Sequence, residues 1–212
     1  PCELRPLFTS LGIRVPARVE LSRDTRTGGD FPRSNFRAAL QLAASHGVDA
    51  VCFTPFNKAA MRSADPGYDD EIGYATEVLG TTGTASEFNI LEGLWNARVT
   101  SHVPLSAVAA SITREAVVNA IRLTQRSLRE ANIASPRIAV AGLNPHAGDG
   151  GNFGREEIDA IRPAVDDARH EGITVDGPFP ADTVFVSARN VNIDAVVTVY
   201  PDQEPVAVKL MG

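Results

Sequence analysis

The spacing of hydrophobic residues predicts three helices, at residues 33–46, 113–132 and 156–170. In each segment apolar side chains return every three or four residues, which places them on one face of a helix. Gly47 ends the first pattern, whereas Thr113 is a suitable N-cap for the second and Glu115 favours its positive start. We therefore expect amphipathic helices that bury one face.

Four short apolar runs rich in β-branched residues predict strands, at residues 48–54, 137–143, 183–188 and 194–200. In the first of them, VDAVCFT, we expect Cys52 to be buried. The Pro- and Gly-rich stretch GITVDGPFPADT is expected to be a tight connection. Strands that alternate with helices over most of the chain are typical of the α/β class.

Composition excludes several classes of function. The chain has 212 residues, 43% of them hydrophobic, which suits one large or two small globular domains. Its 26 acidic and 20 basic residues give a net charge of -6 without any basic block, so we expect no nucleic-acid partner. No apolar run approaches the roughly 20 residues of a membrane span. Two cysteines and no signal pattern favour a reducing cytoplasm.

A glycine-rich segment, AGLNPHAGDGGNFGREEIDAI at residues 141–161, connects a predicted strand to a predicted helix. Parallel-sheet proteins present backbone N–H groups to ligands at such connections. The segment lacks both the Gly-Lys-Ser/Thr of a phosphate loop and the third glycine of a dinucleotide loop. Its distinctive group is His146, which would suit a metal or an anionic substrate. The alternative is a loop histidine that bonds only to a neighbouring carbonyl.

His102 is a candidate partner for His146, because TSHVPL also reads as the end of a strand before a turn. The other two histidines, His46 and His170, end predicted helices, where a cationic side chain is favoured in any case. The pair suggests a shared ion or ligand. The spacings that identify a metal site directly, CxxC and HExxH, are absent.

Four segments taken in order, FTPFNKAAM, TSHVPL, VAGLNPHAGDGGNFGREEID and GPFPADTVF, resemble the PdxA family. PGYDDEIGYA, LWNARVTSHVPL and VKLMG bring the chain closest to its terephthalate dihydrodiol dehydrogenase-type relatives. The resemblance covers residues 35–212, with 1–34 as an irregular or variable start. It implies an isocitrate/isopropylmalate-dehydrogenase-like α/β fold, with open, mostly parallel sheets and flanking helices. Residues 1–212 would form a truncated unit that lacks the usual N- and C-terminal segments, and residues 35–212 would be the family core, which includes the dimer-forming region.

The resemblance also implies an activity, namely the NAD- and metal-dependent oxidation of a secondary alcohol beside a carboxylate, with or without loss of carbon dioxide. The partners would be a small carboxylated substrate or cyclic dihydrodiol and a second copy of the chain. A divalent zinc or magnesium ion would stabilise charge on the alcohol oxygen. Two alternatives stay open: a cofactor-independent decarboxylase, lyase or cyclase on the same scaffold, or a non-catalytic binding paralogue.

The metal ligands that the resemblance implies are His102 and His146. The family's third histidine belongs to a Tyr-His-Asp-Gln motif, and here Pro201 stands in its place. Two imidazoles bind a divalent ion weakly unless a carboxylate completes the set, which Asp202 or Glu204 could supply.

The resemblance assigns further roles to five positions. Lys209 and Asp202 are the candidate catalytic residues, and Lys209 also joins Lys58, Tyr68 and Asp69 as a candidate substrate-binding residue. The acidic turn GYDDE stands where phosphate-handling members have Gly-His-Thr-Glu, and its negative charge disfavours a phosphate monoester. We therefore expect a non-phosphorylated substrate, unless the turn is merely solvated.

Overall fold

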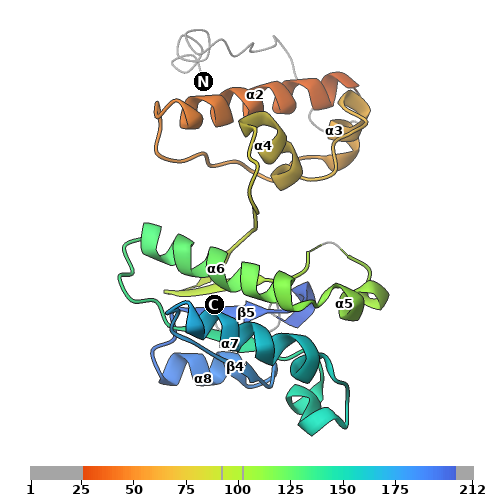
Figure 1. Ribbon diagram of the computed structural model, residues 1–212. Helices are drawn as coiled ribbons and strands as arrows, with labels where there is room; N and C mark the ends of the chain where they lie inside the picture. Colours follow the sequence, from red (N-terminus) through yellow and green to blue (C-terminus); the bar gives the residue numbers. More distant parts are fainter. Residues whose placement is uncertain (1–25, 92, 102, 204–212) are drawn as a thin grey trace. The chain divides into compact units, whose positions relative to one another are not determined.

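The computed structural model describes residues 26–91, 93–101 and 103–203. The chain divides into two compact units, Pro1–Ala85 (unit 1) and Ser86–Gly212 (unit 2), which are described separately (Figure 1). Three residues singled out above, His102, Glu204 and Lys209, lie outside the described residues, as does the side chain of Asp202. Their roles stay predictions.

Three helices make up the described part of unit 1: α2 (Arg26–Ala44), α3 (Lys58–Ala64) and α4 (Glu71–Leu79). They enclose a small core whose buried members are Phe36, Leu40, Met61, Tyr68 and Tyr74. The start of α2 at Arg26 corrects the expectation of an irregular segment up to residue 34. Pro32 interrupts the helical pattern in the sequence, but Gly29 brings the first half of α2 against α3. A Cβ at Gly29 would lie 1.9 Å from the carbonyl oxygen of Ala60.

The strand predicted at residues 48–54 is wrong, because the segment forms no regular structure. Cys52 is exposed rather than buried, and Phe53 is 51% exposed. A strand needs a neighbour that accepts its backbone hydrogen bonds. Within the described residues the only sheet belongs to unit 2. An apolar, β-branched run by itself therefore did not indicate a strand here.

Unit 2 contains a five-stranded sheet in the order β1-β2-β5-β3-β4. The strands are β1 (Asn89–Leu91), β2 (Leu94–Arg98), β3 (Ile138–Ala141), β4 (Val175–Phe179) and β5 (Ala195–Thr198). β1 and β2 form an antiparallel hairpin, whereas β2, β5, β3 and β4 are all parallel. The strands predicted at residues 137–143 and 194–200 are confirmed as β3 and β5.

Helices cover both faces of the sheet (Figure 1). α6 (Arg114–Glu130) and α7 (Arg162–His170) pack on the face to which Ile138 and Val140 of β3 belong. α8 (Val184–Asn190) packs on the opposite face, with Ala139 and Ala141. The alternation along β3 is the two-residue period of a strand that is buried on both sides. The short helix α5 (Leu105–Ser111) follows β2.

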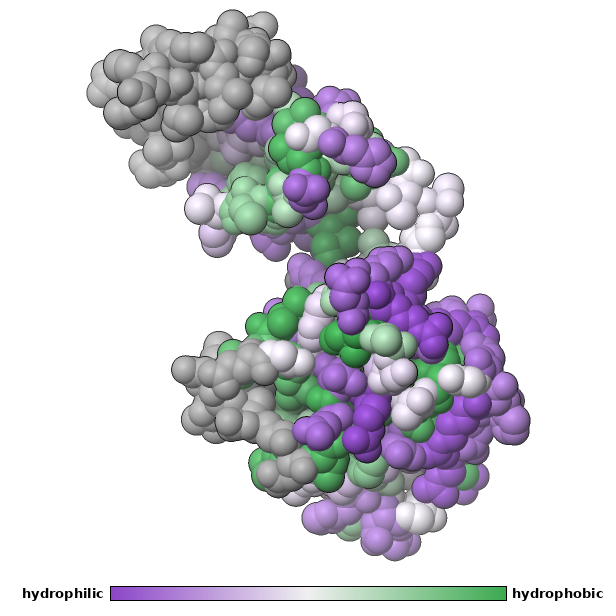
Figure 2. Space-filling model, turned by 90° about the vertical axis from the view of Figure 1, so that its left-hand side faces the viewer, coloured by the Kyte–Doolittle hydropathy of each residue, from purple (hydrophilic) through white to green (hydrophobic). Residues whose placement is uncertain are grey.

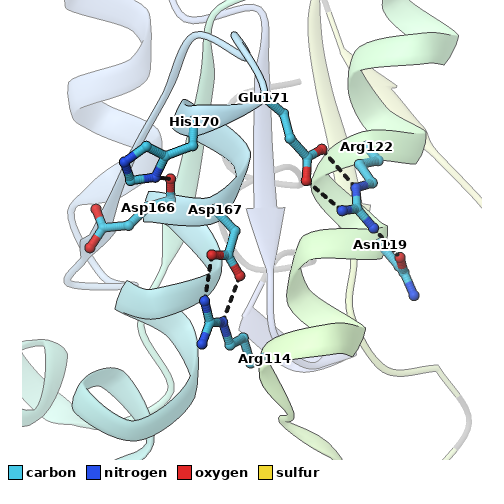
Figure 3. Close-up of polar contacts among 7 residues, drawn as sticks. All are labelled: Arg114, Asn119, Arg122, Asp166, Asp167, His170 and Glu171. Atoms are coloured by element: carbon cyan, nitrogen blue, oxygen red, sulfur yellow. Dashed lines mark hydrogen bonds and ion pairs between the residues drawn. The ribbon is translucent and has the colours of Figure 1, made fainter.

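Two ion pairs join α6 to α7 on the outside of unit 2 (Figure 3). The Arg114 guanidinium donates to both carboxylate oxygens of Asp167, at 2.6 and 2.5 Å, and Arg122 makes the same kind of double contact with Glu171. The N-cap predicted at Thr113 is present, since its hydroxyl accepts a hydrogen bond from the N–H of Ala116 at 3.1 Å. The helices predicted at residues 113–132 and 156–170 are confirmed.

The strand predicted at residues 183–188 is wrong, because this segment forms α8. Val184, Phe185 and Ala188 are its buried residues, a spacing that fits one face of a helix. Their β-branched and aromatic character indicated a strand, but packing against the sheet overrides such propensity. The stretch GITVDGPFPADT, expected to be a tight connection, contains the strand β4, with Gly177 and Pro178 inside it.

The surface of unit 2 is mostly polar on the side drawn in Figure 2, where hydrophobic residues form small patches among hydrophilic ones. Large exposed apolar side chains, such as Ile90, Leu105 and Val186, lie singly in different elements. Scattered exposure of this kind is ordinary for a folded protein. No helix in the described ranges is long and apolar enough to cross a membrane.

Candidate functional site

The candidate site lies at the carboxyl edge of the unit 2 sheet. The parallel strands β2, β5, β3 and β4 all end there, and ligands of open α/β sheets bind beyond such ends. A hollow of about 430 Å³ is lined by residues 143–146 after β3, by Ala181 and Asp182 after β4, and by Tyr200 and Gln203 after β5. This volume falls within the usual range for small-molecule pockets.

A second, smaller hollow of about 220 Å³ shares one lining residue, Tyr200, with the first. Arg98, Ser101 and Pro201 are among its other lining residues. The ends of β2 and β5 thus border one hollow and the ends of β5, β3 and β4 border the other. Together the two hollows follow the carboxyl edge of the sheet.

The loop after β3 has an unusual backbone. His146, Ala147 and Asp149 have φ values of 54°, 53° and 44°, and the glycines at 148, 150 and 151 are also positive. Left-handed backbone costs a residue with a side chain about 1–2 kcal/mol. The loop therefore holds His146 in a conformation that needs support from its surroundings.

Glu157 supplies much of that support. One carboxylate oxygen, Oε1, accepts hydrogen bonds from the backbone N–H groups of Leu143 and Asn144, each at 2.7 Å. The other oxygen, Oε2, accepts from Nδ2 of Asn144 at 2.9 Å. Glu157 is only 1% exposed, so these bonds are made away from water. Hydrogen bonds to a charged acceptor are the stronger kind.

Asn144 is bonded to a second carboxylate as well. Its Nδ2 donates to Glu156 at 2.7 Å, and this bond holds the pKa of the Glu156 carboxyl below its usual range. Gly154 leaves room for the amide, since a Cβ there would lie 2.3 Å from Nδ2 of Asn144. Asn144, two positions before His146, is therefore held by the carboxylates of Glu156 and Glu157.

Gln203 ties the end of β5 to the start of the same loop. Its Oε1 accepts from the N–H of Val199 at 2.9 Å, and its Nε2 donates to the carbonyl of Gly142 at 2.8 Å. On the other side of β5, the hydroxyl of Thr100 donates to the carbonyl of Val199 at 2.8 Å. These bonds hold the strand ends that border the hollows.

His146 is exposed and lines the larger hollow, and its ring lies 6.1 Å from that of Phe153, centroid to centroid. The imidazole is thus placed where a ligand could reach it. A shared site with His102 stays a prediction, because His102 lies outside the described residues. Its neighbours Ser101 and Val103 line the smaller hollow.

The described residues alone do not make a complete metal site. Among residues 26–91, 93–101 and 103–203 no group of three or more His, Cys, Asp or Glu side chains is arranged to hold an ion. Of the described residues, His146 is the imidazole and Asp182 the carboxylate that border the larger hollow. A catalytic zinc site uses about three protein ligands. Pro201 borders the smaller hollow and has no donor atom in its side chain.

The other predicted substrate-binding residues lie in unit 1. Nζ of Lys58 is 3.7 Å from Oε2 of Glu71. Asp69 is almost fully exposed, with its side chain 89% accessible, and it lies 3.7 Å from the guanidinium of Arg62. Neither contact is tight, so both side chains stay accessible. Their role in binding a substrate remains a prediction.

Tyr68 occupies a different position from its neighbours in the acidic turn. Its ring is 4% exposed and packs against Tyr74, with centroids 5.9 Å apart, and its hydroxyl is buried. Burial raises the pKa of this hydroxyl, and the negative charge of Glu71 raises it further. Tyr68 is therefore a core residue of unit 1, and the expected substrate contact remains a prediction. Asp70 caps α4, accepting from the N–H of Gly73 at 2.7 Å.

Sequence reasoning missed four residues of the site: Asp182, Tyr200, Gln203 and Glu157. Each lies in a motif already noted, since Glu157 belongs to FGREE, Asp182 to GPFPADTVF, and the other two to the Tyr-Pro-Asp-Gln segment. The sequence alone did not distinguish the residues that line the hollow from Glu157, which anchors the loop. The hydrogen bonds of Glu157 make that distinction.

A parallel sheet with a ligand-sized hollow at its carboxyl edge defines a class of α/β proteins that hold small molecules beyond their strand ends. Within that class the chain belongs to the PdxA family. The family model described as pyridoxal phosphate biosynthetic protein PdxA matches residues 8–212. The family expected from the sequence is thus confirmed, and so is the α/β fold with its mostly parallel sheet.

Individual relatives are consistent with this assignment. A protein of Rhizobium meliloti, named provisionally as a second 4-hydroxythreonine-4-phosphate dehydrogenase, is 54% identical over 98% of this chain and 60% of its own length. The crystal structure of 4-hydroxythreonine-4-phosphate dehydrogenase from Klebsiella pneumoniae is similar at a TM-score of 0.83 and 35% identity, covering 90% of this chain and 57% of that one. The crystal structure of a terephthalate 1,2-cis-dihydrodiol dehydrogenase from Burkholderia xenovorans is similar at a TM-score of 0.72 and 30% identity, covering 95% of this chain and 62% of that one. The chain spans about 60% of the length of the first of these relatives.

Proposed function

We propose that the chain is part of an NAD-dependent dehydrogenase that oxidises a secondary alcohol beside a carboxylate. The observation that carries the proposal is the hollow at the carboxyl edge, with His146 on its border, in a family whose relatives are named as dehydrogenases. In the reaction the alcohol carbon gives a hydride to NAD⁺ and the hydroxyl gives up a proton, which leaves a ketone and NADH. Where the ketone lies β to the carboxylate, carbon dioxide can leave.

The residues of the chain would contribute mainly by position. His146 would contact the alcohol from the border of the hollow, either as an acceptor of the hydroxyl proton or as a ligand of a divalent ion together with His102. Gln203 and Glu157 would hold the strand end and the loop in place. Lys209 and Asp202 are proposed as further catalytic groups by family resemblance, and a homodimer in the cytoplasm is proposed on the same ground.

For the substrate we propose a non-phosphorylated compound, a hydroxy acid or cyclic dihydrodiol that carries a carboxylate. The support is the acidic turn of unit 1, which the family resemblance assigns to substrate binding and in which Asp69 is exposed. Like charges in this position would disfavour a phosphate monoester. A phosphorylated substrate is the second candidate, and the names of the Rhizobium and Klebsiella relatives favour it.

The test is an assay of the purified protein that contains this chain, with NAD⁺ and either Zn²⁺ or Mg²⁺. Carboxylated dihydrodiols, free hydroxy acids and 4-hydroxythreonine 4-phosphate would be compared by the appearance of NADH. We expect turnover with a non-phosphorylated substrate and a loss of at least about 100-fold in kcat for His146→Ala. Turnover confined to the phosphate ester would overturn the substrate class. Absence of NADH with every compound, in folded protein, would overturn the dehydrogenase itself.

A further inference from the structure

We propose that Glu157 is the positioning residue of the site, and that its buried carboxylate fixes the loop 142–154 and thereby the direction of the His146 imidazole. The consequence for catalysis rests on the proposed function. The placement of the loop does not, and it can be tested without any substrate.

The first support is the set of groups bound to Glu157. Within the described part of the chain, the three donors that it accepts from belong to Leu143 and Asn144, immediately before Pro145 and His146. No arginine, lysine or histidine is among these donors. A carboxylate that is 1% exposed is costly to bury, and here neutral N–H groups compensate it. The arrangement therefore couples the burial of Glu157 directly to the path of the loop.

The second support is the contact between Glu157 and the inside of the left-handed run. A Cβ at Gly148 would lie 2.6 Å from Oε2 of Glu157, so the loop backbone passes directly over the carboxylate. Glu157 thus bonds to the residues before His146 and contacts the glycine two positions after it. The strained segment is held on both sides by one side chain, which limits the directions open to the imidazole.

The third support is the helix in which Glu157 lies. Its residues Glu157–Ile161 form a π-helical turn before α7, and the N–H of Arg162 bonds to the carbonyl of Glu157, five residues back. Such turns are frequent at functional sites. Packing of Ile161, Ala164 and Val165 in the main core of unit 2 anchors this segment. Glu157 therefore transmits the position of a rigid helix to the loop.

A double-mutant cycle tests whether Glu157 acts through His146. Glu157→Gln keeps the size of the side chain but replaces one acceptor oxygen by an amide that donates. In the whole protein we expect kcat to fall by about 100-fold with little change in KM, since displacing a reacting group by about 1 Å costs this much. In a His146→Ala background the same change should cost less than about threefold further. Losses that multiply in full would show that Glu157 does not act through His146.

A second measurement separates the loop from the activity. In NMR spectra we expect Glu157→Gln to shift the ring resonances of His146 and to speed hydrogen exchange at the N–H groups of Leu143 and Asn144. The matched control is Glu130→Gln, the same chemical change at the exposed last residue of α6, which should alter none of these signals. Unchanged signals in Glu157→Gln would overturn the proposal.

The two measurements also distinguish the proposals from each other. If wild-type protein forms no NADH, the dehydrogenase proposal fails, while the NMR comparison still decides the role of Glu157. If Glu157→Gln does not fold, Glu157→Asp serves instead, because it keeps the charge and shortens the reach by one methylene. We expect this variant to fold with kcat between those of wild type and His146→Ala. A folded Glu157→Asp with wild-type kcat and loop signals would overturn the role of Glu157.

Discussion

Two irregular segments of the chain differ in how their backbone is held. The loop 142–154 is fixed by side chains, because Glu157 and Gln203 bond to its N–H and carbonyl groups beneath the surface. Residues 48–56 are largely exposed, and their main described contacts are between aromatic rings, with Phe53 and Phe56 stacked at 5.3 Å. Directional bonds specify one conformation, whereas stacking at a surface tolerates several. A loop without regular structure can therefore still present a residue such as His146 in one direction.

Among changes that affect the loop 142–154, the largest effect should come from removing Glu157 itself. Glu157→Ala leaves three N–H groups without their acceptor and opens a void beside Gly148. We expect the free energy of unfolding to fall by about 3 kcal/mol. Urea denaturation measures it, and Glu130→Ala on the surface should change the same quantity by less than about 0.5 kcal/mol. Equal values for the two variants would remove the distinction between an anchored and an unanchored loop.

Two glycines of the loop separate crowding from backbone strain. Gly148 and Gly150 have φ values of 82° and 66°, but a Cβ would collide with Glu157 only at the first, and it meets nothing within 4 Å at the second. We expect Gly150→Ala to lower the free energy of unfolding by about 1 kcal/mol, from strain alone. Gly148→Ala should cost about 2 kcal/mol or more, since it adds the collision. Urea denaturation of both variants gives the two free energies of unfolding. Similar values would mean that the Glu157 carboxylate moves aside for the added methyl group at little energetic cost.

In the exposed segment a larger truncation should matter less. Phe53 is 51% exposed, and the centroid of its ring lies 4.7 Å from that of Phe36. Phe53→Ala removes this ring. We expect a loss of about 1 kcal/mol, the size of an aromatic pair at a surface. Thermal or urea unfolding would show it. The control is Phe36→Ala in the core of unit 1, which should cost about 3 kcal/mol or more. A cost for Phe53→Ala that matched its control would show that this segment is as firmly held as the loop.

The sequence predicted the elements whose buried residues repeat at a regular spacing. It gave wrong predictions for short segments, whose structure depends on the elements they pack against. The helices at 113–132 and 156–170 repeat their apolar positions over several turns, so their buried face could be identified. Residues 48–54 and 183–188 are too short for a period to emerge, and β-branched composition favoured strands that neither segment forms. The failure is physical, because a strand requires a neighbour that a local pattern does not contain.

The same distinction applies to the site. His146 could be proposed from its place between a strand and a helix, because that connection has a known use in parallel sheets. Glu157 could not, since its sequence position, in the first turn of a helix, looks like an ordinary favourable charge. Its role follows from bonds to residues 13 and 14 positions away. Long-range hydrogen bonds of this kind leave no mark in the local sequence.

The exposed ion pairs between α6 and α7 should give the smallest effect of all (Figure 3). The Arg114 guanidinium holds the pKa of the Asp167 carboxyl below its usual range, and Arg122 does the same to Glu171. A carboxyl whose pKa is lower in the folded state adds stability above its unfolded pKa and loses it as the pH falls through the folded value. We therefore expect Asp167→Asn to lower the free energy of unfolding slightly at neutral pH. Well below pH ~4 the substitution should have no effect on it. Both carboxylates are accessible to solvent at the surface, so salt should weaken the effect as well.

Urea denaturation of wild type and Asp167→Asn at neutral and acid pH, each at low and high salt, checks this. The two proteins should differ most at neutral pH and low salt. A difference that persisted at acid pH would mean that Asp167 stabilises the helix pair through packing rather than through its charge. The Glu157 carboxylate is buried, and its described hydrogen-bond donors are neutral N–H groups. The loss of stability in Glu157→Ala at neutral pH should therefore depend little on salt. Salt at constant pH thus separates the anchored loop from the solvated ion pairs.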